Sequence, residues 1–100
     1  MAEEALYVIT HIDFTPPSAQ AGAVALAEHV AVLRAHPDVL RVELLQQVFR
    51  KNHYELLTVW SSTGAHEASL SSDVVREFRE RIHAGLGSPY DERVHILIAT

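Results

Sequence analysis

Seven histidines are the side chains of this chain most able to exchange protons or bind a metal near neutral pH. They are His11, His29, His36, His53, His66, His83 and His95. None has the spacing of the helical zinc motifs H-x-x-x-H and His-Glu-x-x-His. His11 lies two residues from Asp13, and His53 lies two residues from Glu55. Each such pair shares one side of a strand and could join a site made from several strands. We expect the histidines to be solvated or hydrogen-bonded, and we predict no metal site.

A second group of interest surrounds the only tryptophan, Trp60. Tyr54 and Thr58 precede it at even spacing, so the three side chains share one face of an extended strand. An aromatic wall with two hydroxyls and one indole N–H suits a small aromatic or enolic ligand. The alternative is that Trp60 packs in the core, as its large apolar area favours. If His11 points toward the same space, it could exchange a proton with such a ligand.

Composition and length exclude several classes of protein. The net charge of −5, without a basic run, argues against a nucleic-acid partner. The lack of cysteine excludes disulfides, thiolate metal sites and Cys-His nucleophiles, and no Gly-rich phosphate loop or G-x-S-x-G motif occurs. No apolar run approaches the ~20 residues of a membrane span, and the N-terminus lacks the basic residues of a signal peptide. We predict one cytoplasmic domain over residues 1–100 with no membrane partner.

Hydrophobic periodicity predicts the elements that position these residues. Alternating apolar side chains indicate strands over residues 5–14 and 94–99, and a hairpin within residues 40–60 around a turn at 50–53. Apolar residues at three- and four-residue spacing indicate helices over residues 18–36, 65–70 and 74–82. The segment Tyr90-Asp91-Glu92-Arg93 is interpreted as a loop with a local ion pair.

The order β-α-β-β-α-β predicts an α+β, ferredoxin-like fold whose antiparallel sheet carries its helices on one face. The strands are apolar on both sides, so the uncovered face carries Tyr7, Ile9, Leu45, Leu57 or their neighbours. An apolar face of that size marks a partner surface, and a two-fold dimer presents the same patch twice. A chain of 100 residues buries only about two-thirds of its unfolded surface. We therefore expect a sheet-to-sheet homodimer.

Three segments carry a resemblance to a known family. They are Leu40-Arg41-x-x-x-Leu45-Gln46, Asn52-His53-Tyr54-x-Leu56-x-x-x-Trp60 and Gly87-Ser88-Pro89-Tyr90-Asp91-Glu92-Arg93. With the order of elements, they resemble the antibiotic biosynthesis monooxygenase (ABM) family of dimeric α/β-barrel proteins over nearly the whole chain. The resemblance implies the same dimer and a ligand cavity between each sheet and its own helices. It also implies oxygenation of quinols or polyketides without metal or flavin, so no cofactor is expected.

Two positions depart from the family's pattern. Thr58 stands where the third strand usually carries an acidic residue, and Ser69 stands where the second helix usually carries a histidine. His66 lies one turn before Ser69 on a similar helix face and could substitute for that histidine. The candidate catalytic bases are therefore His11 and His66. The candidate substrate-binding residues are Tyr54, Thr58, Trp60 and Ser69.

Three functions follow from the resemblance. The first is a cofactor-independent monooxygenase acting on a quinol, polyphenol or polyketide-like aromatic. The second is a non-catalytic, dimeric small-ligand-binding or accessory protein. The third is an isomerase that uses the same cavity for proton transfer. The two changed positions weigh against the first and third, whereas the aromatic wall favours a ligand. We predict the first, with the ligand-binding protein as the alternative.

Overall fold

A computed structural model describes residues 4–100, so the first three residues of the expected single domain lie outside it. The strands are β1 (Leu6–Asp13), β2 (Val39–Gln46), β3 (His53–Trp60) and β4 (Asp91–His95). The helices are the 3-10 turn η1 (Pro16–Ser18), α1 (Ala19–Arg34), α2 (Thr63–Leu70) and α3 (Asp73–His83). None of these helices is long and apolar enough to cross a membrane.

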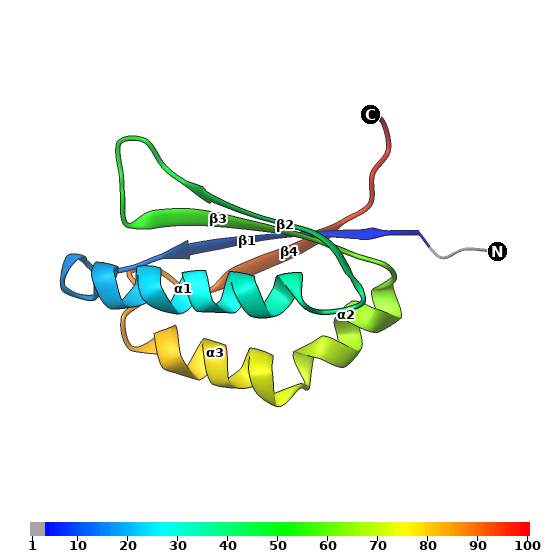
Figure 1. The fold of residues 1–100 in the computed structure, drawn as a ribbon. Coiled ribbons are helices and arrows are strands. Elements are labelled where there is room, and N and C mark those ends of the chain that lie inside the picture. The colour runs from blue at the N-terminus through cyan, green and yellow to red at the C-terminus, as the bar shows by residue number, and fades with distance from the viewer. Residues whose placement is uncertain (1–3) are drawn as a thin grey trace.

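The four strands form one antiparallel sheet in the order β2-β3-β1-β4. Figure 1 shows α1, α2 and α3 together on one side of this sheet. The predicted α+β, ferredoxin-like fold with helices on one face is therefore confirmed. In the register of β1 and β3, Leu6 lies opposite Trp60 and Asp13 lies opposite His53. Because side chains alternate along a strand, even-numbered residues of both strands face the helices and odd-numbered ones face away.

Two apolar clusters fill the space between sheet and helices. The cluster at one end consists of Leu6, Val8, Val30, Leu33, Val42, Leu56 and Trp60. The cluster at the other end consists of Ile12, Phe14, Ala25, Leu26, Tyr54, Phe78 and Ile82. Helix α1 approaches the sheet closely at Gly22, where an added Cβ would lie 2.5 Å from the Phe14 ring. The small side chains of α1 thus set the thickness of the layer.

Two serine caps determine where α2 and α3 begin. Ser62 Oγ accepts a hydrogen bond from the Ala65 backbone N–H, and Ser72 Oγ accepts one from Val75 N–H. Each cap satisfies a donor that the first helical turn leaves free. The structure confirms two short helices in this part of the chain, which begin two residues and one residue before the predicted starts at 65 and 74. The buried side chains of α2 are His66 and Ser69, which lie one turn apart on the same face of the helix.

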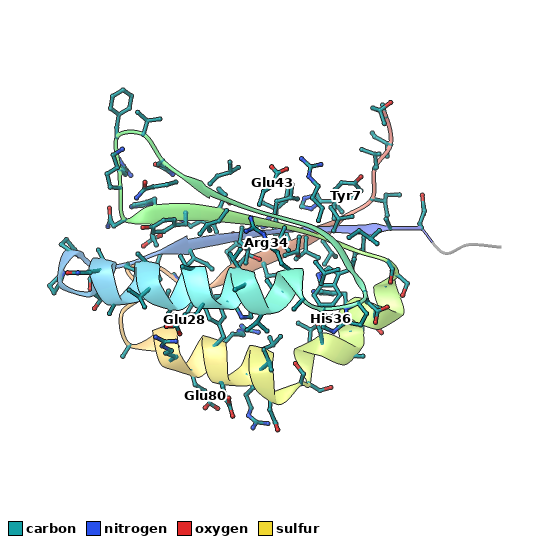
Figure 2. The ribbon with its side chains drawn as sticks, viewed as in Figure 1. Tyr7, Glu28, Arg34, His36, Glu43 and Glu80 are labelled. Atoms are coloured by element: carbon teal, nitrogen blue, oxygen red, sulfur yellow. The ribbon has the colours of Figure 1, made fainter. Side chains whose placement is uncertain are left out.

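The face of the sheet away from the helices, called the open face below, is uncovered in the single chain. Figure 2 shows Tyr7 and Glu43 on this side. Ile9 is 40% exposed and Leu45 is 55% exposed, which confirms the apolar character predicted for this face. Figure 1 also shows the β2–β3 hairpin and the C-terminal segment rising on the same side, so they flank the open face.

The last strand differs from its prediction. The expected strand over residues 94–99 is replaced by β4 at Asp91–His95, so the predicted loop supplies three of the five strand residues. Ladder pairing with β1 places Glu92 opposite Thr10 and Val94 opposite Val8. The apolar residues after β4 are exposed instead, and Ile98 reaches 91%. An apolar run indicates burial, but it does not tell a strand of the chain's own sheet from a segment available to a partner.

Candidate functional site

A small cavity of about 30 Å³ lies between the sheet and its helices at the end near Trp60. It is lined by Val8, Thr10, His29, Leu33, Leu56, Thr58, Trp60, His66, Ser69, Leu70, Val75, Tyr90 and Glu92. Most of these side chains are apolar, and the polar ones come from five different elements or loops. The cavity therefore combines an apolar wall with a few convergent polar groups, as small-molecule sites do.

The polar centre of the cavity is a paired histidine and carboxylate. His66 Nε2 lies 3.0 Å from Glu92 Oε1, and the two side chains are 7% and 20% exposed. Helix α2 brings His66 to this point, and the β1–β4 register brings Glu92. A carboxylate on one ring nitrogen fixes the orientation of an imidazole and leaves the other nitrogen to exchange a proton. With Nε2 donating to Glu92, Nδ1 is that second nitrogen.

Trp60 and Thr58 form the sheet side of the cavity. The indole Nε1–H donates to Thr58 Oγ1 at 3.1 Å, and the indole meets the His66 ring edge-on with centroids 5.6 Å apart. Ser69, which also lines the cavity, donates from Oγ to the His66 carbonyl oxygen. The Trp60 indole thus packs against the His66 ring. The indole N–H and the Thr58 hydroxyl are already hydrogen-bonded to each other.

Tyr90 closes the cavity beside Glu92. Burial raises the pKa of the Tyr90 phenol to about 12, and the nearby Glu92 carboxylate acts in the same direction. The Arg79 guanidinium stacks 4.3 Å from the centre of the Tyr90 ring and covers it from α3. Tyr90 therefore remains a neutral O–H donor over the physiological pH range.

His29 of α1 separates the cavity from a groove on the surface. Its ring stacks on Phe78 with centroids 3.8 Å apart and an interplanar angle of 4°. The groove, of about 270 Å³, lies between α1 and α3 and includes both rings in its lining. Burial lowers the pKa of His29 to about 4, so this ring is neutral at physiological pH.

The buried His29 makes stability depend on pH. Its folded-state pKa of about 4 lies below the ordinary value of 6.5, so below pH 6.5 the unfolded chain binds a proton that the folded chain does not. The stability gained from the neutral ring is complete above pH 6.5 and is lost as pH falls toward 4. We expect His29→Phe, which keeps a flat ring against Phe78, to remove about 2 kcal/mol of the stability loss between about pH 7.5 and about pH 5.

Urea unfolding of both proteins across this pH range measures the effect. The same carboxylates titrate in both proteins, so their contribution cancels when the two slopes of unfolding free energy against pH are compared. Parallel stability curves for wild type and His29→Phe would show that the ring is protonated in the folded state.

The structure unites four of the predicted site residues and separates two. His66, Ser69, Thr58 and Trp60 line one cavity. Tyr54 shares the face of Thr58 and Trp60, but it lies six residues from Trp60, roughly 20 Å along the strand. It packs in the other apolar cluster and accepts a hydrogen bond from Gln46 Nε2 at 3.3 Å. The single aromatic wall expected from Tyr54 and Trp60 is therefore corrected to Trp60 alone.

His11 lies on the open face, on the other side of the sheet from the cavity, so it does not serve a ligand there. Its Nδ1 lies 2.8 Å from Glu55 Oε1, and its Nε2 lies 2.9 Å from Asp13 Oδ2. The hydrogen bond with Glu55, followed by that with Asp13, raises the pKa of His11 despite partial burial. Burial alone would raise the pKa of Asp13, but hydrogen bonds with Ser88 and His11 outweigh it and lower that pKa.

Sequence reasoning missed Glu92, Tyr90, His29 and Thr10 as cavity residues. The spacing of Tyr90 and Glu92 was the available signal, because residues two apart on a strand face the same side. Because this segment was interpreted as a loop, Tyr90 and Glu92 were not assigned to one face of a strand. No local pattern links His29 or Thr10 to the cavity, since both become neighbours of His66 only through packing of α1 and β1.

Comparison with known proteins gives a family and a set of similar folds. The sequence model described as "Antibiotic biosynthesis monooxygenase" matches residues 5–81. SnoaB, a cofactor-independent oxygenase from Streptomyces nogalater, has a TM-score of 0.85 at 14% identity, covering 97% of this chain and 96% of its own. A protein from Pseudomonas aeruginosa has a TM-score of 0.88 at 21% identity and covers 99% of both chains.

A protein from Mycobacterium tuberculosis also has a TM-score of 0.88, at 17% identity, covering 96% of this chain and 97% of its own. No curated protein matches the chain. At these identities the solved structures establish the fold, whereas the family match rests on the sequence itself.

Proposed function

Because the chain belongs to the antibiotic biosynthesis monooxygenase family, we propose that it is a cofactor-independent monooxygenase acting on a quinol, polyphenol or polyketide-like aromatic. The observation that supports this proposal most is the buried His66–Glu92 pair beside Trp60. The pair supplies a base in the cavity between the sheet and its helices, although Ser69 stands at the family's usual histidine position and Thr58 at its usual acidic position.

The first step is removal of a proton from the substrate. His66 Nδ1 accepts the phenolic or enolic proton, and Glu92 stabilises the resulting imidazolium through Nε2–H. The neutral Tyr90 hydroxyl donates a hydrogen bond of 3.5 Å to the second Glu92 oxygen and so helps to hold the carboxylate that faces the imidazolium. A largely apolar cavity strengthens these interactions because little water competes with them.

The second step uses the electrons of the substrate anion. One electron passes to O2, and the two radicals combine to form a carbon–oxygen bond and a peroxide. Protonation and loss of water from the peroxide leave a carbonyl on the substrate. One oxygen atom of O2 thus enters the product and the other leaves as water, so the electrons balance without metal or flavin.

Substrate binding requires the cavity to widen. A volume of about 30 Å³ holds one or two water molecules, whereas sites for small organic ligands measure about 300–1,000 Å³. The His29–Phe78 stack separates the cavity from the groove of about 270 Å³. We propose that a flat substrate enters here by displacing this stack, since His29 lines both spaces.

We also propose that two copies pack through their open faces. Ile9 and Leu45 lie on the flat surface, while Phe49 at the hairpin tip is 96% exposed and Ile98 beyond β4 is 91% exposed. A single chain gains little from exposed apolar side chains at these four places. A second copy related by two-fold symmetry would cover all of them at once.

The alternative is a non-catalytic ligand-binding protein of the same fold. The Thr58 hydroxyl, which stands at the usual acidic position, already accepts the Trp60 N–H and carries no charge. A cavity with Trp60 and without an active base would still bind a flat aromatic molecule. Loss of oxygenation with retention of binding separates this function from catalysis.

Oxygen uptake by metal-stripped protein tests the proposal. We expect uptake above the buffer rate with at least one member of a panel of hydroquinones and anthrones, and quenching of Trp60 fluorescence by the same compound. Quenching by panel members without oxygen uptake would contradict catalysis and favour the ligand-binding alternative. A substrate-specific rate that disappears on heating the protein supports an enzyme rather than spontaneous oxidation.

A further inference from the structure

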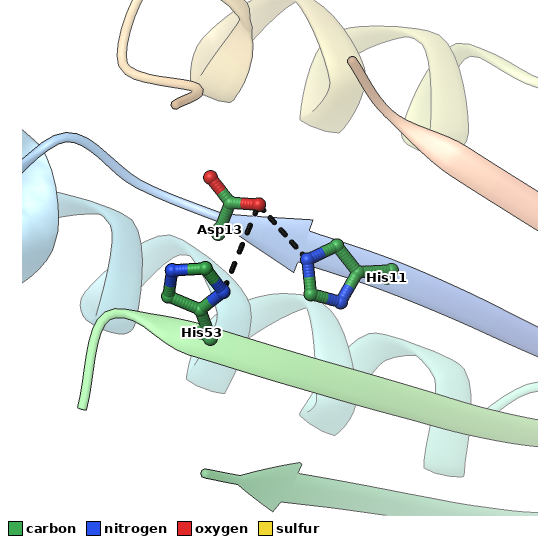
Figure 3. Close-up of side chains that lie close together, drawn as sticks. All are labelled: His11, Asp13 and His53. Atoms are coloured by element: carbon green, nitrogen blue, oxygen red, sulfur yellow. Dashed lines mark hydrogen bonds and ion pairs between the residues drawn. The ribbon is translucent and has the colours of Figure 1, made fainter. Parts of the chain in front are cut away.

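Three metal-ligand atoms converge on the open face of the sheet, outside the cavity (Figure 3). His11 Nε2 lies 2.9 Å and His53 Nδ1 lies 3.9 Å from the same atom, Asp13 Oδ2. All three atoms lie within 4.8 Å of one another. Among residues 4–100, no other three histidine, aspartate or glutamate side chains converge in this way.

The ladder of β1 and β3 builds this group. Asp13 lies opposite His53, and His11 lies opposite Glu55 in the same register. Side chains two apart on a strand share a face, and opposite residues of antiparallel strands have Cβ atoms about 5 Å apart. The four side chains therefore occupy adjacent positions on one surface, and the sheet itself fixes their spacing.

We propose that His11, Asp13 and His53 bind one divalent first-row transition-metal ion, of which zinc is our test case. Two imidazoles and one carboxylate form a donor set used by zinc and by other divalent transition metals. Ligands about 2.0–2.1 Å from a tetrahedral ion lie about 3.3 Å apart, between the two distances to Asp13 observed here. In the single chain, His11 and His53 are 28% and 22% exposed, so an ion can reach both rings.

Glu55 supports the donor set without being part of it. Its Oε1 lies 2.8 Å from His11 Nδ1, on the side of the ring opposite the ligand nitrogen. Histidines that bind metals usually donate the other ring N–H to a carboxylate or carbonyl, which orients the ring and makes it a better ligand. We assign Glu55 as a positioning residue for His11.

The loop after α3 holds the Asp13 carboxylate. Ser88 Oγ donates a hydrogen bond to Asp13 Oδ2, and the Gly87 N–H donates to the Asp13 carbonyl at 3.0 Å. An added Cβ on Gly87 would lie 2.5 Å from Asp13 Oδ1, so only glycine fits against the carboxylate without a shift. The aspartate is thereby 8% exposed and has one orientation before any ion binds.

The ion would act on structure rather than on the proposed oxygenation. The site lies on the opposite side of the sheet from His66, and it joins the end of β1, the start of β3 and the Gly87 loop. It is therefore independent of the proposed oxygenation, although it lies on the same open face as the proposed contact between two copies. An ion bound only by the folded chain raises its stability in proportion to the logarithm of the metal concentration.

Calorimetric titration of tag-free, metal-stripped protein with zinc chloride tests the site. We expect one ion per chain with a Kd of about 1 μM or tighter, and a rise in Tm of about 10–15 °C at a hundredfold excess over Kd. His53→Ala and Asp13→Asn should each weaken binding at least about 30-fold. Glu55→Gln should weaken it about 10–100-fold, because the amide cannot supply the same charge to His11.

His83→Ala is the matched control, since His83 lies exposed on α3 and should leave the affinity unchanged. Circular dichroism establishes that each variant is folded, and the visible absorption of bound cobalt(II) gives a second readout that Asp13→Asn should abolish. No zinc binding by wild type would overturn the proposal. So would equal affinity in wild type, His53→Ala and Asp13→Asn, which would leave the cluster as a hydrogen-bonded network only.

Discussion

His66→Gln should lower kcat for oxygenation by about 10²–10⁴-fold and change KM by less than about threefold. The glutamine Nε2 can still donate to Glu92, so the partly buried carboxylate keeps a partner. The amide has no nitrogen that accepts a proton at neutral pH, so only the basic function is lost. Steady-state oxygen uptake with the best substrate of the hydroquinone and anthrone panel gives both constants.

Two further variants make this result specific. Glu92→Gln should lower kcat by about tenfold, because a neutral amide can hold the imidazole but stabilises the imidazolium less. His83→Ala changes an exposed histidine outside the cavity and should keep the wild-type rate. If His66→Gln keeps full activity while remaining folded, His66 is not the base and the proposed first step is wrong.

Ile9→Glu should convert the proposed dimer to single chains, weakening association at least about 100-fold. Ile9 lies near the centre of the open face, and two-fold symmetry brings both introduced carboxylates into one interface. Unpaired buried charges and like-charge contacts cost several kcal/mol. Ile9 lies opposite Arg93 on β4, so the new carboxylate has a cation beside it in the single chain and should not unfold it.

Val24→Glu is the control for the change in charge. Val24 on α1 is 48% exposed, close to the 40% of Ile9, but it lies on the helical side of the molecule. Sedimentation equilibrium at micromolar concentration should find wild type and Val24→Glu as dimers. A wild-type protein that sediments as a stable single chain would refute the dimer, and an unaffected Ile9→Glu dimer would place the interface elsewhere.

The sequence predicted the fold because each element carries a local signal. Alternation along residues 5–14 and within residues 40–60 predicted β1 and the β2–β3 hairpin, and apolar residues at helical spacing predicted α2 and α3. The prediction of the last strand was wrong because an apolar run can pair within the chain's own sheet or remain available to a partner. Residues 94–99 are apolar except for His95, but only the ladder with β1 determines that pairing ends at His95.

The site was harder to predict than the fold because it depends on which face is covered and on contacts between distant segments. Both sides of β1 carry apolar residues, so alternation alone did not tell whether His11 or Thr10 faces the helices. His66 and Glu92 are 26 residues apart and meet only when α2 packs against the sheet. Tyr54 shows the opposite error, since a shared face does not imply a shared cavity when two residues lie six positions apart.

The central claim is that the buried His66–Glu92 pair lets this chain insert oxygen into a bound aromatic without a metal. Mass spectrometry of the product formed under heavy-oxygen-labelled O2 by metal-stripped protein tests it most directly. We predict one labelled oxygen atom in each product molecule with wild type, and only the background level of product with His66→Gln. Unlabelled product, or labelled product formed equally by both proteins, would contradict the account.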